Sequence, residues 1–260
     1  MNKPKIFLSH ITEEADFASA FRSEIESSFL GMVDVFQSSS QNSLRVGRNW
    51  LNDITEALRD CQAIIVFCSP YSVGRPWINF ECGAGWARDI EVVPVCHSGT
   101  RPVDLPVPIN LLQGIEGDDA SKLQQIFDMI ASKLGAQSPC VDTRELARKI
   151  HTLSLAYVEE VEITKHVRTL KSINLELFNI ICTSPANVVQ AIEGVPQLLV
   201  ERCRQPFEAL QTRGKLQYGF NMNAVAFGGP GGGGNLGTLS LQLDMTLVEL
   251  FKKVADEEEA

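Results

Sequence analysis

Apolar and polar residues alternate between two patterns in the first half of the chain. Short, continuous apolar runs are typical of buried strands. Between these runs, apolar residues recur every three or four positions, which is the spacing of a helix with one buried face. Strands are expected at residues 5–8, 33–36, 63–68 and 91–96. Helices are expected at residues 13–29, 50–58, 76–87 and 121–134.

This succession of strand–helix units predicts an α/β domain at residues 1–136, with a parallel sheet and helices on both faces. Thr12 is the expected N-cap of the first helix, and Gly135 is expected to end the last one. Pro94 indicates an edge position or a bulge in its strand.

The second half of the chain has a different pattern. After a boundary at residues 137–142, we expect a smaller, mainly helical domain with a β-hairpin over residues 143–260, serving oligomerisation or sensing. Its expected helices are at 143–181, at 185–210 with an interruption near 194–196, and at 247–255. The hairpin strands are expected at 215–227 and 238–245, joined by a glycine-rich connection.

The glycine-rich connection, Gly228–Gly237, does not have the pattern of a phosphate-binding loop. Such a loop needs a Lys-Ser/Thr pair after the last glycine and a following helix. Here Gly237 precedes Thr238, Leu239 and a strand pattern. A flexible loop or an interaction tip is the favoured interpretation.

Composition narrows the class of protein. Apolar residues make up 44% of 260 residues, and no apolar run approaches a membrane span, so we expect a cytoplasmic protein. The net charge of −9 argues against direct contact with nucleic acid. The seven cysteines form no CxxC pair or zinc-spaced cluster, which favours buried, reduced thiols and no metal site.

Short polar segments follow the expected strands, at Ser9–His10, Gln37–Ser40, Ser69–Ser72 and His97–Ser98. In a parallel sheet these segments share one edge, where ligands bind in open α/β folds. Trp77 and Glu81 are four residues apart in the helix that follows the third strand, so they lie one turn apart on one face. The sequence therefore predicts a polar cleft with one aromatic ring and one carboxylate.

The ordered set Ile6-Phe-Leu-Ser-His10, the loop from Phe36 to Arg48, the strand 63–69 and Trp77-Ile-Asn-Phe-Glu81 resembles a Toll/interleukin-receptor (TIR) domain. The resemblance is strongest to the bacterial, NAD-consuming branch and covers residues 4–135, about half of the chain. It implies a flavodoxin-like fold with five parallel strands, the fifth of them near residues 110–115. We recognise no family in the C-terminal region.

The resemblance also implies roles for individual residues. Glu81 matches the glutamate that TIR glycohydrolases require, and Trp77 matches the aromatic residue beside it. The segment from Gln37 to Arg48 matches the loop that gates the site and mediates self-association, with serines here in place of the family's usual Asp. The expected substrate-binding residues are Trp77, Ser9, His10, Ser38 and Arg45.

These expectations define an enzyme that cleaves the nicotinamide–ribose bond of NAD, as a glycohydrolase or cyclase, with NAD as substrate and no cofactor. The resemblance further implies activation by homo-oligomerisation through both domains, a protein or small-molecule activator, and a role as an antiphage defence effector. A non-catalytic TIR scaffold is the alternative function. For single residues, the alternatives are a helix-dipole partner for Glu81, packing for Trp77 and a structural hydrogen bond for His10.

Overall fold

The computed structural model describes residues 3–38, 50–222 and 235–256. These residues form two compact units, Met1–Val158 and Glu159–Ala260, and each unit has its own sheet and core. The predicted boundary at residues 137–142 precedes helix α5, Thr143–Ile173, which begins within the first unit. The two units are described separately below.

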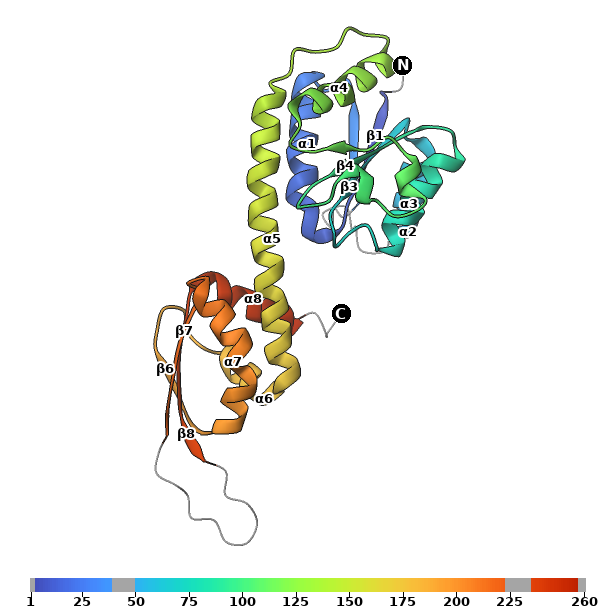
Figure 1. Ribbon diagram of the computed structural model, residues 1–260. Helices are drawn as coiled ribbons and strands as arrows, with labels where there is room; N and C mark the ends of the chain where they lie inside the picture. Colours follow the sequence, from blue (N-terminus) through green and yellow to red (C-terminus); the bar gives the residue numbers. More distant parts are fainter. Residues whose placement is uncertain (1–2, 39–49, 223–234, 257–260) are drawn as a thin grey trace. The chain divides into compact units, whose positions relative to one another are not determined.

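The first unit is built on a five-stranded sheet in the order β2-β1-β3-β4-β5 (Figure 1). Each pair of neighbouring strands is parallel, as the alternation of strand and helix patterns predicted. The order places β3 at the centre, between β1 and β4, with the carboxyl ends of the parallel strands along one edge. The strands are β1 Lys5–Ser9, β2 Asp34–Gln37, β3 Ala63–Cys68, β4 Glu91–Cys96 and β5 Ile115–Glu116.

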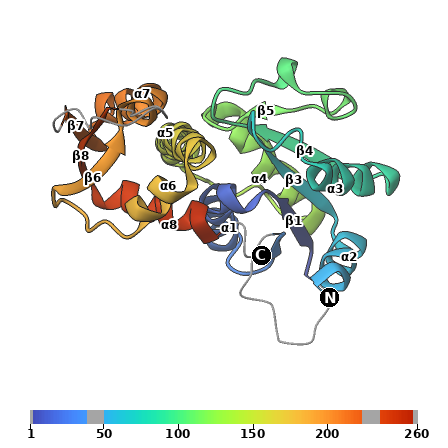
Figure 2. The same cartoon turned by 90° about the horizontal axis from the view of Figure 1, so that it is seen from below.

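Helices cover both faces of this sheet (Figures 1 and 2), which confirms the predicted flavodoxin-like class. The central strands are apolar on both sides because neither side meets water. Phe7 and Ile64 belong to the core that includes Ile78 of α3. Phe67, one residue out of phase with Val66, instead packs edge-on against Phe21 of α1 at 5.1 Å. The helices are α1 Ala15–Ser28, α2 Trp50–Asp60, α3 Pro76–Ala87 and α4 Ala120–Leu134, with 3-10 turns η1 Thr12–Glu14, η3 Pro102–Asp104 and η4 Ile109–Leu111.

Helix ends follow the expected chemistry at α4 and depart from it at α1. The Asp119 carboxylate accepts hydrogen bonds from the N–H groups of Ser121 and Lys122, and Gly135 ends α4 in the left-handed region at φ 63°. Thr12, however, does not cap α1. It begins the 3-10 turn η1, so the backbone enters α1 through Glu14 without a side-chain cap.

Pro94 lies neither in an edge strand nor at a bulge, because β4 pairs in unbroken register with β3 and also pairs with β5. The prediction failed because β5 is only two residues long. β5 pairs only with Val95 and Cys96 of β4. At Pro94, therefore, β4 has a neighbouring strand on its β3 side only. A proline, which has no N–H, is tolerated there for the same reason as in an edge strand.

The second unit has a three-stranded antiparallel sheet in the order β6-β8-β7, with one face against helices. Leu239, Leu241 and Leu243 alternate inward from the middle strand, and α7 contributes Phe207 to the same core. The expected hairpin and terminal helix are both present. The elements are α6 Leu175–Cys182, β6 Gln190–Pro196, α7 Gln197–Thr212, β7 Leu216–Met222, β8 Leu236–Leu243 and α8 Met245–Asp256.

Two expected helices in this region differ from the structure. The helix expected at 143–181 is interrupted at Asn174, whose side chain accepts a hydrogen bond from the N–H of Leu177 and starts α6. The first part of the helix expected at 185–210 is strand β6. A bulge between Ile192 and Val195 shifts the register of β6, which obscures the two-residue period that would have identified it. Most of the glycine-rich connection lies outside the described residues.

A glycine sets how closely α3 approaches the sheet. A Cβ at Gly85 would lie 2.5 Å from Val92 Cγ2 and 2.7 Å from Ile64 Cδ1, whereas a Cβ at Gly83 meets nothing within 4 Å. We expect Gly85→Ala to reduce the free energy of unfolding by about 1–3 kcal/mol through overpacking. Gly83→Ala, the control in the same helix, should be neutral or increase it by up to about 1 kcal/mol. Urea denaturation measures both, and equal effects would contradict this account of the packing.

Candidate active site

The candidate site lies at the carboxyl ends of the central strands. β1 ends at Ser9, and β3 leads into α3 through a turn in which Ser69 and Ser72 are buried. In that turn the Ser72 hydroxyl accepts a hydrogen bond from the N–H of Ser69 at 2.8 Å. Pro76 occupies the first turn of α3, where its missing N–H costs nothing. The turn therefore fixes where α3 begins and which of its residues face the end of β1.

Glu81 is the buried carboxylate of this site. Its side chain is on the sheet-facing part of α3, next in sequence to the core residue Cys82, and its exposed fraction is 0%. The Ser9 hydroxyl donates a hydrogen bond to Glu81 Oε2 at 2.5 Å, which links α3 to the end of β1. Among the residues that the structure describes, Glu81 Oε1 makes no hydrogen bond of ordinary geometry, and the Trp77 side chain is the second group after Ser9 that interacts with the carboxyl group. One carboxylate oxygen is thus held and the other is available to a ligand.

Burial raises the pKa of Glu81 from 4.5 to about 8. The cause is desolvation, which disfavours the charged form of a carboxyl group. The side chains of Ser9 and Trp77 favour the ionised form and lower the pKa, but they only partly offset the burial. Among the described residues, no cation shifts this pKa. A cationic ligand would therefore add a positive charge that these residues do not provide.

Trp77 lies one turn before Glu81, as the spacing predicted, and it is half-buried. Its indole stacks on the ring of Phe80, with centroids 5.2 Å apart and planes at 27°. Phe80 is itself 50% exposed. The pair presents an aromatic surface beside the buried carboxylate.

Ser38 and His10 lie together at the ends of β2 and β1. The N–H of His10 donates to Ser38 Oγ at 3.1 Å, and the Ser38 hydroxyl donates back to the carbonyl oxygen of His10 at 3.2 Å. Ser38 thereby joins the two strand ends next to Ser9. The His10 ring is on the other side of the sheet, edge-on to Phe67 at 6.5 Å, and burial lowers its pKa. The structure thus brings together Ser9, Trp77 and Glu81, but the His10 ring is not among them.

Arg45, the remaining predicted substrate-binding residue, lies outside the described residues. The same holds for the predicted gating loop from residue 39 to Arg48. The assignment of Arg45 to substrate binding and of the loop to gating therefore stays a prediction.

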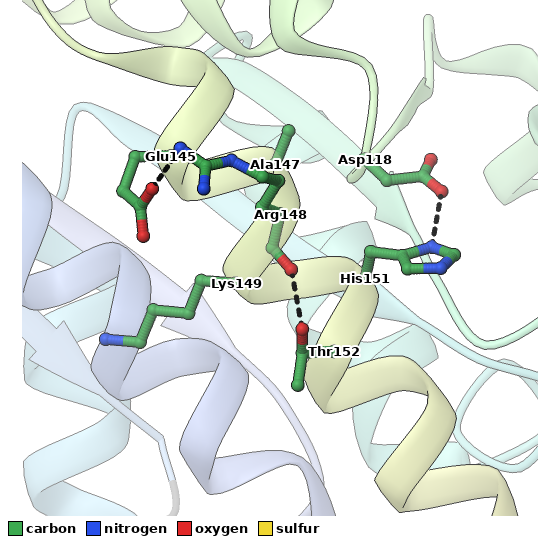
Figure 3. Close-up of a pocket in the computed structure, with 7 residues that line it drawn as sticks. All are labelled: Asp118, Glu145, Ala147, Arg148, Lys149, His151 and Thr152. Atoms are coloured by element: carbon green, nitrogen blue, oxygen red, sulfur yellow. Dashed lines mark hydrogen bonds and ion pairs between the residues drawn. The ribbon is translucent and has the colours of Figure 1, made fainter.

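Other polar groups gather at the ends of β4 and β5, where the sequence had indicated only His97 and Ser98. One cavity there, of about 590 Å³, is open to solvent and lined mainly by α5 (Figure 3). An ion pair joins His151 Nδ1 to Asp118 Oδ2 at 3.5 Å at its margin. The lining residues are Asp118, Glu145, Ala147, Arg148, Lys149, His151 and Thr152, and none belongs to the Glu81 site.

A neighbouring cavity of about 530 Å³ is lined in part by His97, which follows β4. His97 Nε2 lies 3.3 Å from Glu14 Oε1 in a buried pair, and Phe17 packs against the imidazole with ring centroids 4.0 Å apart. Sequence analysis missed this pair because Glu14 is in the first expected helix, far from His97 in sequence. The pair closes the α1 side of the sheet and is separate from Glu81.

Two further features of the described residues bear on function. Residues 3–38, 50–222 and 235–256 contain no group of three or more His, Cys, Asp or Glu side chains that could hold a metal ion. Within the same ranges, no helix is both long and apolar enough to cross a membrane.

Comparison with known proteins identifies the fold of the first unit. The family model of the TIR domain matches residues 6–127, the segment that contains the sheet, α3 and Glu81. These residues are a TIR domain. No curated protein matches the chain. Among solved structures, a 2-desoxiribosyltransferase from Leishmania mexicana is similar at 21% identity and a TM-score of 0.31, covering 38% of this chain and 68% of that one. A likeness at that level carries no functional argument.

The buried carboxyl group predicts a pH-dependent effect of Glu81→Gln on stability. The pKa is about 8 in the folded state and 4.5 in the reference state, so the favourable protonated form is fully populated below about 4.5. Wild-type stability then declines as the pH rises toward 8. Gln, which is always neutral, should match wild type at pH 4 and exceed it by a few kcal/mol, at most about 5, at pH 8.5.

Thermal unfolding of wild type and Glu81→Gln from pH 4 to pH 9 measures this difference. Glu56→Gln, an exposed position in α2, is the control and should show no such trend. A Glu81→Gln protein that is less stable than wild type at pH 8.5 would contradict the assigned burial.

Proposed function

We propose that this TIR domain cleaves the nicotinamide–ribose bond of NAD, with Glu81 as the catalytic carboxylate. The observation that carries the proposal is the state of Glu81. It is fully buried, held by Ser9 through one oxygen, and its other oxygen makes no hydrogen bond of ordinary geometry within the described residues, with Trp77 as the neighbouring polar group. Structural glutamates in a core normally have a hydrogen-bonded or charged partner for each oxygen. A TIR scaffold has no requirement for this arrangement.

The chemistry of NAD fits a single carboxylate. A glycosidase uses one carboxyl group to protonate the leaving oxygen and a second to meet the developing positive charge on the sugar. The nicotinamide of NAD is already a cationic pyridinium, so it leaves as a neutral molecule and needs no proton. The remaining requirement is to stabilise the oxocarbenium-like transition state, which a buried anion does effectively.

The raised pKa of Glu81 suits this role. A carboxyl group without a cation at hand is protonated in the empty site near neutral pH. A bound pyridinium or a developing oxocarbenium ion beside it would favour ionisation, because an opposite charge lowers a carboxyl pKa. The attraction between Glu81 and the substrate would therefore be strongest when the positive charge is on the ribose, in the transition state. An interaction that is stronger in the transition state than in the bound substrate accelerates the reaction.

Ser9 and Trp77 have supporting roles in the proposal. Ser9 positions the carboxylate by holding Oε2, leaving Oε1 for the ribose hydroxyls or the anomeric carbon. Trp77, stacked on Phe80, offers a flat surface against which a nicotinamide ring can pack. Attack by water releases ADP-ribose. Attack by an adenine nitrogen or a ribose hydroxyl gives a cyclic product instead.

We further propose that self-assembly activates the enzyme and that it serves as an antiphage defence effector. TIR domains commonly act through TIR–TIR contacts. Depletion of NAD by an assembled effector would halt the metabolism on which a phage depends. The second unit, with its own core and sheet, is the part of the chain available for sensing or oligomerisation.

Nicotinamide release from NAD tests the activity. The purified 260-residue chain at high concentration should release nicotinamide, and Glu81→Gln should reduce kcat by at least about 100-fold, the scale of one electrostatic catalytic group. Glu56→Gln should retain wild-type turnover. The absence of turnover by the assembled wild-type protein would favour the scaffold. Normal turnover by Glu81→Gln would leave the activity but remove the assigned role.

The pH dependence tests the ionisation of Glu81 and the role of Ser9. Because the free enzyme needs the ionised carboxylate, kcat/KM should rise tenfold per pH unit below about 8 and level off above it. The Ser9 hydrogen bond lowers this pKa, so Ser9→Ala should move the midpoint to higher pH. A midpoint that stays in place or moves down would show that Ser9 does not act through Glu81.

A further inference from the structure

The sheet of the second unit has two different edges. Strand β6, at one edge, is irregular: its register with β8 shifts between Ile192 and Val195. Gly194 lies inside this bulge at φ +73°, and Pro196 ends the strand without an N–H group. Bulges, prolines and charges such as Glu193 are the features by which proteins prevent another strand from pairing with an edge.

Strand β7, at the other edge, has none of these features. All seven residues, Leu216–Met222, pair with β8 in one unbroken register. The strand contains no proline and no charged residue. Its sequence is therefore suited to pairing on both sides, although β8 occupies only one.

The direction of the free backbone groups follows from one hydrogen bond. The N–H of Asp244 donates to the carbonyl oxygen of Lys215 at 3.0 Å. The backbone groups of Lys215, the residue just before β7, therefore face the β8 side. Backbone groups in an antiparallel strand alternate in direction, so Gln217, Gly219 and Asn221 also face β8. The groups that face away from β8 belong to Leu216, Tyr218, Phe220 and Met222, and no other strand of the described residues pairs with them. Leu216 is buried, so the accessible part of this edge begins at Tyr218.

The side chains of β7 sort by face in the same alternating way. Tyr218 and Phe220 pack on the core of the unit, with Tyr218 5.1 Å from the ring of Phe207, yet both remain partly exposed at the edge. Met222, on the same face, is 62% exposed. The opposite face carries Gln217, Gly219 and Asn221, all exposed and uncharged. A strand that pairs with β7 at this edge would therefore need apolar side chains on its core-facing side and polar side chains on its other side.

We propose that the free edge of β7 pairs antiparallel with β7 of a second copy of this chain, about a two-fold axis at Gly219. In this register Tyr218 lies opposite Phe220, and the two pair through accessible outward-facing backbone groups. Met222 lies opposite Leu216, at the buried end of the strand. Gln217 lies opposite Asn221, and Gly219 lies opposite its own copy. Every apolar side chain meets an apolar one, every amide meets an amide, and the two three-stranded sheets become one.

The strand is thus its own complement, which is why a second copy is the assigned occupant. An unrelated peptide would need apolar residues at alternate positions to match Tyr218 and Phe220, whereas β7 already has them. No charge on either copy opposes the contact. This inference does not rest on the proposed NAD chemistry, since it concerns a different unit and is measured without NAD.

Gly219 and Ala191 offer a matched pair of test positions. Both lie opposite Ser240 of β8 and both are exposed, but Gly219 is on the β7 edge and Ala191 is on the β6 edge. A Cβ at Gly219 meets nothing within 4 Å and its φ is not positive, so Gly219→Lys fits the single chain. In the paired strands, two lysines would face each other across the axis, where Cα atoms are about 4.5 Å apart. Ala191→Lys places the same charge on the β6 edge.

Light scattering after size exclusion should give wild type a mass that is an even multiple of one chain. Gly219→Lys should halve that mass, and Ala191→Lys should leave it unchanged, with far-UV circular dichroism of all three the same. A monomeric wild type, an unchanged mass for Gly219→Lys, or an equal loss in both variants would overturn the proposal.

A cross-link tests the register and does not depend on how Gly219→Lys folds. In a Cys140→Ser background, which removes an exposed thiol, Gly219→Cys should form a covalent dimer under mild oxidation. Ala191→Cys should remain a single chain. A Gly219→Cys protein that stays uncross-linked would exclude pairing about this axis.

Discussion

Much of the TIR domain can be understood from the cost of placing a carboxyl group inside it. Glu81 has no accessible surface, and its solvation is replaced by one hydroxyl from Ser9 and the half-buried indole of Trp77. That replacement is incomplete, and the pKa of about 8 measures how incomplete it is. For the carboxyl group to lie there at all, β1 must end at a small hydroxyl residue, and α3 must lie close enough to the sheet to reach it. Gly85 allows the second condition.

Sequence reasoning recovered this arrangement because each part has a local signal. The buried runs of β3 and β4 were predicted at their observed bounds, and the Pro76 start of α3 fixed Trp77 and Glu81 on one face. Ser9 was named as a rim residue, but its hydrogen bond to Glu81 depends on β1 and β3 being neighbours, which no local pattern encodes. Successive residues of a strand point to opposite faces of the sheet. Because the Ser9 side chain points toward α3, the His10 ring lies on the other side.

The predictions that failed depend on context that lies far away in sequence. Pro94 is tolerated because β5 is too short to reach it, and β5 lies about twenty residues downstream. Strand β6 was read as helix because its bulge hides the alternation, and only pairing with β8 makes it a strand. The pairing of Glu14 with His97 joins α1 to the end of β4. In each case the local residues are permissive, and a distant partner decides the outcome.

The irregular strand β6 has a consequence for the size of any assembly formed through the sheets. Two copies joined at β7 would present only their β6 edges outward, and the Gly194 bulge and Pro196 leave little for a further strand to bind. Sheet extension would therefore stop at two chains and could not continue into a fibre. Any larger complex would have to be built by joining such pairs through other surfaces of the chain, and it would contain an even number of TIR domains.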